Sequence, residues 1–152
     1  MKKFPLFVLS IFMMMGTAFA QIENPVKWTY TAKKIDSKTY ELHMTATLEN
    51  KWHIYAQNAG EGPEPTVFSF AKNPLLKLDD KVKEIGKLEK HYDPNFKSEL
   101  KFYSNKVDFV QKVKVKSSAA TVVKGTVSYM VCDDKKCLPP KEIPFSIKLG
   151  GK

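Results

Sequence analysis

Apolar and polar residues alternate with a period of two along most of this chain. The clearest run places Tyr40, Leu42, Met44, Ala46 and Leu48 on one side. Successive side chains of a β-strand point to opposite faces, so this run predicts a strand with one buried face. The same spacing recurs at Val26, Trp28 and Tyr30, at Val107, Phe109, Val113 and Val115 around Gln111, and at Ile143, Phe145, Ile147 and Leu149.

Turn-forming residues separate these runs. Two glycines and two prolines lie within residues 58–65, and a second turn signal covers residues 92–95. Short strands divided in this way are typical of two antiparallel sheets packed face to face. We therefore predict an all-β fold, an immunoglobulin-like antiparallel β-sandwich.

Residues 79–90 fit two interpretations. Val82, Ile85 and Leu88 lie three residues apart, a spacing that also suits one face of a helix. Gly86 lies among them and costs a helix about 1 kcal/mol relative to alanine. The segment is either a strand of the sandwich or a short helix.

The N-terminus has the pattern of a cleavable export signal. Lys2 and Lys3 precede an apolar run over residues 4–15, and Ala18-Phe19-Ala20 then supplies a small-x-small cleavage pattern before Gln21. The run is short for a membrane span, which disfavours an uncleaved anchor, and no cysteine follows the cleavage site as a lipoprotein would require. We predict a signal peptide over residues 1–20 and a single periplasmic domain over residues 21–152.

The positive charge of the chain consists entirely of lysine. All 25 basic residues are lysines, and removal of Lys2 and Lys3 leaves 23 against 16 acids, a net charge of +7 for residues 21–152. Arginine, the usual bidentate reader of bases and phosphates, is absent, and the lysines are scattered. This argues against nucleic-acid binding and indicates a solvated surface.

The only two cysteines, Cys132 and Cys137, are close enough in sequence to meet across a tight turn. Val127, Tyr129 and Val131 share one face of a predicted strand, and Cys132 lies on the other face at its end. Cys137 falls in the connection to the next strand, before two prolines that cannot donate ladder hydrogen bonds. Cys137 is therefore expected to be the more accessible sulfur.

Two functions remain open for a bridge between these cysteines. Closing so small a loop stabilises the fold by on the order of 2 kcal/mol, and a domain of this size does not need it to bury a core. The bridge is either a structural staple of a non-catalytic secreted binding module or a reversible pair that an exposed turn presents to a partner thiolate. The charges of residues 133–136 favour neither.

The cysteine segment resembles a known family. The stretch TVSYMVCDDKKCLPP over residues 126–140, followed by Ile143-Pro144-Phe145, is similar to the active-site hairpin of the N-terminal periplasmic domain of DsbD, the thiol:disulfide interchange protein. Trp52-His53-Ile54-Tyr55 with its Gly/Pro loop, and the segment from His91 to Phe96, resemble two further parts of that domain. The resemblance runs from about residue 28 to residue 149.

The resemblance implies a relay of electrons through a redox-active pair, Cys132 and Cys137. It also implies that Phe96 is an aromatic lid over the pair and that Asp93 is an acid near the sulfurs. From the residues alone, Phe96 could equally pack in the core, and Asp93 before a proline could simply form a turn. Tyr55 packs either under the cysteine loop or in the sandwich. The second acid that the family pattern places beside Asp93 is replaced here by Pro94 and Asn95.

The resemblance further implies the partners. They would be thioredoxin-fold proteins as donor and acceptor, including cytochrome c maturation factors, together with a separate membrane electron conduit. We expect a monomeric thiol-disulfide interchange component with no organic cofactor, because the sulfurs themselves carry the two electrons. His53 and His91 do not give a paired-ligand spacing with the cysteines, so no metal site is predicted.

Overall fold

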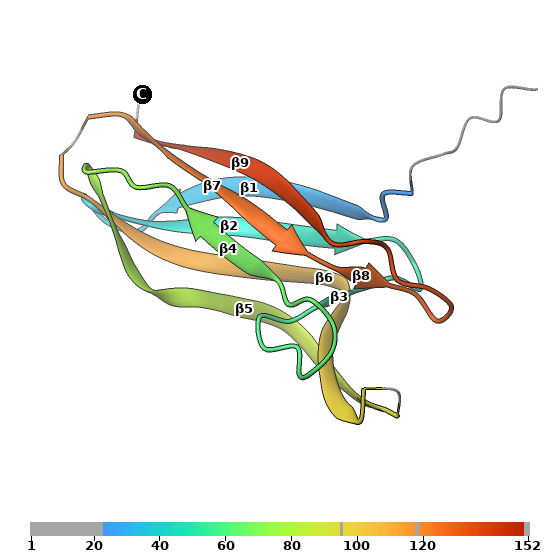
Figure 1. The fold of residues 1–152 in the computed structure, drawn as a ribbon. Helices are drawn as coiled ribbons and strands as arrows, with labels where there is room; N and C mark the ends of the chain where they lie inside the picture. The colour runs from blue at the N-terminus through green and yellow to red at the C-terminus, as the bar shows by residue number, and fades with distance from the viewer. Residues whose placement is uncertain (1–22, 95, 118, 151–152) are drawn as a thin grey trace, which may run out of the picture.

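The computed structural model describes residues 23–94, 96–117 and 119–150, and these residues form an all-β structure (Figure 1). The predicted signal peptide lies outside the described residues. No helix in the described ranges is long and apolar enough to cross a membrane. The strands are β1 (Val26–Lys34), β2 (Thr39–Leu48), β3 (His53–Tyr55), β4 (Val67–Phe70), β5 (Leu76–Asp93), β6 (Ser98–Val115), β7 (Thr121–Tyr129), β8 (Val131–Cys132) and β9 (Lys141–Leu149).

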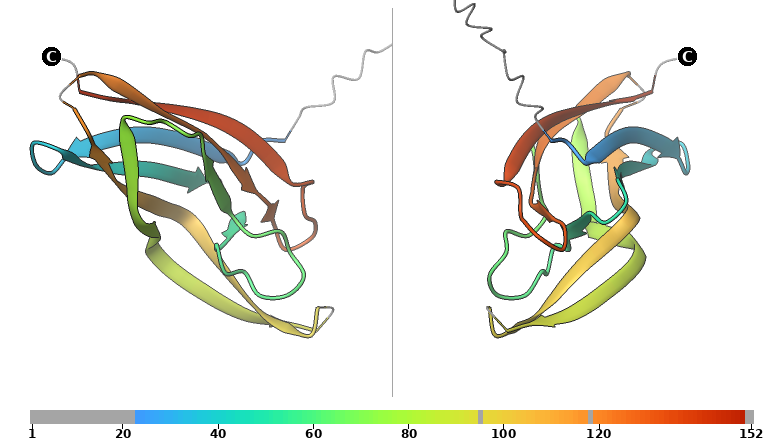
Figure 2. Two further views of the ribbon diagram at one scale, coloured as in Figure 1. Left: turned by 60° about the vertical axis from the view of Figure 1, so that its left-hand side comes forward. Right: turned by 90° about the vertical axis from the view of Figure 1, so that its right-hand side faces the viewer.

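The strands form two antiparallel sheets that pack as an immunoglobulin-like sandwich, as the sequence predicts (Figure 2). The larger sheet has the order β1-β2-β6-β3-β8, with β5 also paired to β6, and the smaller sheet has the order β4-β7-β9. β6 is long enough to pair with β2 through its C-terminal half and with β3 through its N-terminal half. β5 pairs with the same residues of β6 and therefore lies along the opposite edge.

The core confirms the alternating pattern of the sequence. On β2 every second residue from Tyr40 to Leu48 is buried, and Val107, Phe109, Val113 and Val115 of β6 are buried beside them. Phe109 and Trp28 pack together with rings of the smaller sheet. Burying one face of each strand against the other sheet removes apolar surface from water, which is the main stabilising contribution to such a fold.

Residues 79–90 form a strand, and the helical interpretation of their spacing is wrong. They belong to β5, whose pairing with β6 is interrupted between Asp79 and Lys83 and between Gly86 and Leu88. A β-bulge shifts the alternation of faces, so apolar residues three positions apart arise without a helix. Ile85 and Leu88 are in fact exposed on this strand.

Gln111 fills the first of these interruptions. It is only 2% exposed, on the same face as Phe109 and Val113. Its Nε2 donates to the backbone carbonyl oxygens of Asp79 at 2.9 Å and of Asp80 at 3.3 Å. The one polar residue in the apolar series of β6 therefore has its amide group bonded to backbone carbonyls beside the interruption.

Three connections meet at one end of the sandwich. Figure 1 shows the turn between β5 and β6, the loop between β3 and β4 and the turn after β8 at this end. The loop between β3 and β4 is attached to the start of β6, because the Lys101 N–H donates to Ala59 O at 2.9 Å and the Glu61 N–H donates to Ser98 Oγ at 3.0 Å. The candidate site lies among these connections.

Candidate functional site

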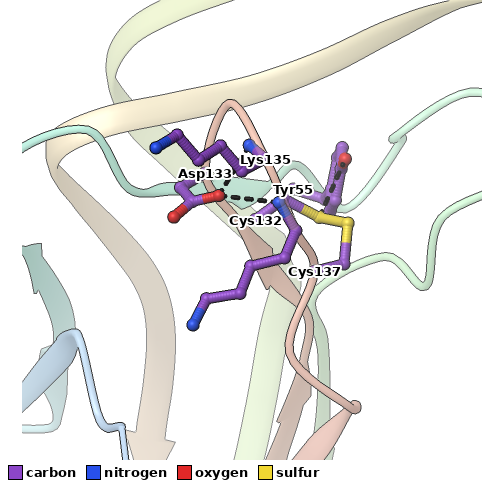
Figure 3. The surroundings of a disulfide bond; sticks show 6 residues. Tyr55, Cys132, Asp133, Lys135 and Cys137 are labelled. Atoms are coloured by element: carbon purple, nitrogen blue, oxygen red, sulfur yellow. Dashed lines mark hydrogen bonds between the residues drawn. A yellow bond between two sulfur atoms is a disulfide. The ribbon is translucent and has the colours of Figure 1, made fainter.

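Cys132 and Cys137 form a disulfide beside the end of the larger sheet (Figure 3). β8 ends at Cys132, and the chain turns back so that Cys137 faces it as an isolated antiparallel bridge, with 4.0 Å between the two Cα atoms. The Asp133 N–H donates to Lys136 O at 2.9 Å and closes the turn. Cys132 lies at a strand end and Cys137 in the next connection, as predicted. The single strand predicted through residues 127–132 is wrong, however, because β7 ends at Tyr129 in the smaller sheet and β8 begins at Val131 in the larger sheet.

Asp133 shapes the tip of this cysteine hairpin, defined here as residues 131–138. Its Oδ1 accepts hydrogen bonds from the N–H groups of Lys135 and Lys136, both at 2.7 Å (Figure 3). These two bonds to the charged form hold the pKa of the Asp133 carboxyl below its usual range. The Lys136 ammonium also lies 5.9 Å from the centroid of the Trp52 ring. The hairpin is therefore fixed by local bonds.

Cys132 is the enclosed member of the pair. It is 2% exposed and packs in a small cluster with Tyr55, Ala59 and Leu100. The Tyr55 hydroxyl donates a hydrogen bond to Cys132 Sγ at 3.3 Å (Figure 3). Of the two positions that the sequence allows for Tyr55, the structure places it under the cysteine loop, with its polar end on the sulfur.

The electrostatic setting keeps the Tyr55 phenol protonated. Burial raises the pKa of this phenol, and the negative charge of Asp93 raises it further. Tyr55 therefore remains a hydrogen-bond donor at neutral pH. Asp93 also forms the turn that follows β5, since its Oδ1 accepts a bond from the Phe96 N–H at 3.3 Å. Asp93 therefore forms the turn and also lies near enough to Tyr55 to raise the pKa of its phenol.

Cys137 is exposed, in contrast to Cys132. After Cys137 the backbone is hydrogen-bonded to the end of the preceding strand at Leu138, whose N–H donates to Val131 O at 2.9 Å. Two exposed prolines follow before β9 begins. The accessibilities of the two cysteine residues therefore differ in the direction that the sequence predicts.

A groove of about 870 Å³ runs along this end of the molecule. Its walls come from β3, from the hairpin of β5 and β6, and from the cysteine hairpin. All five residues that the sequence singles out line it: Tyr55, Asp93, Phe96, Cys132 and Cys137. Three segments far apart in the chain thus meet at one opening, beside the disulfide.

Phe96 lies at the tip of the β5–β6 hairpin and is not a core residue. Its side chain is 46% exposed. The ring rests against the backbone of Gly62, because a Cβ atom added at Gly62 would lie 2.2 Å from Phe96 Cδ1. Gly62 also has a φ of 125°, which side-chain-bearing residues rarely adopt. The core alternative for Phe96 is therefore wrong.

His53 is a groove residue whose placement beside the cysteines the sequence does not predict. His91 also lines the groove. The available signal was the strand period, because a residue two positions before Tyr55 shares its face. Within the described ranges, no three His, Cys, Asp or Glu side chains are placed to hold a metal ion.

Comparison with protein families gives a match over residues 21–148 to the model described as "Thiol:disulfide interchange protein DsbD, N-terminal". This range includes the groove and both cysteines. Among curated proteins, no sequence matches the chain significantly.

Solved structures share the fold at low sequence identity. The N-terminal periplasmic domain of ScsB from Proteus mirabilis has a TM-score of 0.59 and 16% identity, and the match covers 84% of this chain and 47% of that one. The DsbD N-terminal domain of Neisseria meningitidis in its reduced form has a TM-score of 0.51 and 14% identity, covering 82% and 86%. The structure of the complex between the DsbD and PilB N-terminal domains of Neisseria meningitidis has a TM-score of 0.50 and 12% identity, and the match covers 83% of this chain and 87% of that one. The chain thus spans about half of the ScsB domain and most of the Neisseria domain.

Proposed function

The chain belongs to the family of the N-terminal domain of the thiol:disulfide interchange protein DsbD, and from this membership we propose that it relays electrons by thiol-disulfide exchange through Cys132 and Cys137. The observation that carries the proposal is the unequal exposure of the two bridged cysteines at the mouth of a groove. Exchange needs one sulfur that a partner thiolate can reach and a second that resolves the mixed disulfide.

The groove residues have distinct parts in this reaction. A partner thiolate attacks Cys137 Sγ, the disulfide breaks, and Cys132 leaves as a thiolate with the electron pair. The Tyr55 hydroxyl, which donates to that sulfur in the oxidised protein, stabilises the charge that develops there. The second thiol of the partner then releases Cys137 and leaves the module reduced. Burial and then the charge of Asp93 raise the pKa of the Tyr55 phenol, which stays a donor, and Phe96 acts as the lid.

Thioredoxin-fold proteins are the proposed donor and acceptor, with cytochrome c maturation factors among the acceptors and a separate membrane conduit upstream. A relative from Neisseria meningitidis forms a complex with the PilB N-terminal domain, so a domain of this fold docks another protein domain. The ScsB relative is a periplasmic domain. We propose the same compartment here, reached through removal of residues 1–20, with residues 21–152 acting as a monomer.

We expect protein isolated from its oxidising compartment to carry the Cys132–Cys137 bridge and a thioredoxin-like reductase to open it without unfolding the domain. Because the bridge closes only a small loop, it contributes on the order of 2 kcal/mol to the free energy of unfolding. The main core lies in the sandwich outside that loop, so opening the bridge should leave the fold intact. Mass spectrometry after alkylation, with and without reductase, measures the bridge, and circular dichroism follows the fold. Two free thiols in the isolated protein would contradict the proposal. Resistance to the reductase would favour the binding module with a structural disulfide.

Phe96→Ala should speed alkylation of the reduced cysteines severalfold, because the lid is removed. The free energy of unfolding should change by only about 0.5 kcal/mol, as is usual at exposed positions. Tyr92→Ala is the matched control. Tyr92 is an exposed aromatic residue of the same hairpin, but it does not line the groove, so its removal should leave the alkylation rate unchanged. Equal alkylation rates in wild type and Phe96→Ala would show that Phe96 does not shield the cysteines.

A further inference from the structure

His53 lies directly opposite Cys132 on the neighbouring strand. In the pairing of β3 with β8, His53 is the Cα partner of Cys132. Residues directly opposite in an antiparallel pair project to the same face with Cβ atoms about 4.5–5.5 Å apart. Both side chains line the groove. Once the disulfide opens, rotation about the Cα–Cβ bond of Cys132 can bring its sulfur to the imidazole.

The ring of His53 is held among aromatic side chains. Its centroid lies 4.5 Å from that of Phe102 and 5.4 Å from that of Tyr55, with the Tyr55 ring perpendicular to it. The side chain is partly buried, and this desolvation lowers the pKa of the imidazole below its ordinary value. The ring is therefore neutral at neutral pH and has a nitrogen that can accept a proton.

Charged groups face this ring from several elements. Asp133 and Asp134 of the cysteine hairpin and Glu89 of β5 act to raise its pKa, but the effect of burial is larger. The same groove is also lined by four lysines, Lys51, Lys90, Lys135 and Lys136, and by His91 and Asp93 of β5. The carboxylates also disfavour a thiolate nearby, and Cys132 is enclosed, so its thiol needs a base in order to react.

We propose that His53 is the proton acceptor that turns Cys132 into a nucleophile when the pair resolves a mixed disulfide. The inference deepens the proposed exchange function and rests on it. Family membership alone does not assign this role to a histidine at the position opposite the enclosed cysteine.

In the reduced protein the Cys137 thiolate attacks the disulfide of an acceptor, and one acceptor sulfur leaves as a thiolate. Cys132 then gives its proton to a ring nitrogen of His53 and attacks Cys137 Sγ, expelling the second acceptor sulfur with its electron pair. The cysteine pair loses two electrons to the acceptor, and His53 passes the proton to solvent. In the reverse direction, protonated His53 returns the proton to the Cys132 thiolate.

The two attacks can be measured separately with an aromatic disulfide reagent that releases a coloured nitrothiobenzoate at each attack. The first release follows attack by Cys137, and its rate rises with reagent concentration. The second release is the intramolecular attack by Cys132, and its rate is independent of reagent concentration. Stopped-flow absorbance on the reduced wild-type protein, His53→Gln and His53→Phe gives both rates. His53→Phe keeps a ring against Phe102 and Tyr55, so at least one variant preserves the packing.

We expect both variants to slow the second release about 100-fold near pH 7, at the low end of the usual contribution of a general base. The first release should stay within about twofold of wild type, since Cys137 does not use this base. In wild type the second release should slow as the pH falls through the lowered pKa of His53, because the protonated ring cannot accept a proton. Near pH 10 the thiol ionises without help, and variants and wild type should converge.

His43→Gln is the matched control, because His43 lies on β2 outside the groove, where its Nδ1 is 2.7 Å from Asp108 Oδ2. It should change neither rate. The proposal is overturned if the second release is as fast in both His53 variants as in wild type. It is also overturned if the variants slow both releases equally, or slow the second as much near pH 10 as near pH 7, since those results indicate altered packing. The reagent needs no protein partner, so failure of the relay itself would appear separately, as absence of a trapped partner.

Discussion

A Cys132→Ser variant that retains Cys137 accumulates a covalent complex with a thioredoxin-fold partner, whereas Cys137→Ser accumulates much less. Cys137 is exposed and can form a mixed disulfide, and Cys132, which would resolve it, is absent from the trapping variant. In Cys137→Ser the remaining cysteine is Cys132, a residue that is only 2% exposed in the wild-type protein and is poorly placed for attack by a partner. A non-reducing gel shows the complex as a band that disappears on reduction.

The comparison between the two cysteine variants tests the roles of the two sulfurs and the relay at once. Wild type is the control for rapid resolution, and the double variant Cys132→Ser/Cys137→Ser is the control for nonspecific capture. Equal trapping by both single variants would show that the sulfurs are not functionally distinct. If neither variant traps a thioredoxin-fold protein, the module is a stapled binding domain.

Gln111→Leu should destabilise the domain by about 3 kcal/mol, because leaving a buried backbone carbonyl unsatisfied costs about 1–3 kcal/mol and Gln111 Nε2 bonds the carbonyls of Asp79, Asp80 and Lys112. Leucine is close to glutamine in size, so the loss of hydrogen bonds is the main change. Urea denaturation measures the free energy of unfolding.

Lys106→Leu is the control for this substitution, since it places leucine at an exposed position of the same strand. It should change the free energy of unfolding by only about 0.5 kcal/mol. A Gln111→Leu variant as stable as wild type would show that water satisfies the carbonyls of Asp79 and Asp80 and that Gln111 does not support the interruption in β5. The experiment therefore tests whether the core of β6 and the irregularity of β5 depend on each other.

The strands of the core could be predicted because their signal is local. β2, β9 and, apart from the additionally buried Val110, the part of β6 from Val107 to Val115 bury alternate residues. Burial of one face of a strand leaves this period in any sequence that forms it. The β5 strand is the exception. Its register shifts between Asp79 and Lys83 and between Gly86 and Leu88 are set by pairing with β6, so residues 79–90 show no clean period of two.

The candidate site divides in the same way. The amino-acid sequence by itself determined that Cys132 and Cys137 can meet across a tight turn, because only four residues separate them. Only the tertiary structure decided the surroundings of the sulfurs. Tyr55 reaches Cys132 from 77 positions away in the chain, and His53 is opposite Cys132 only because β3 pairs with β8. Such neighbours follow from the order and register of strands in a sheet, which depend on burial summed over the whole domain and leave no mark in the local sequence.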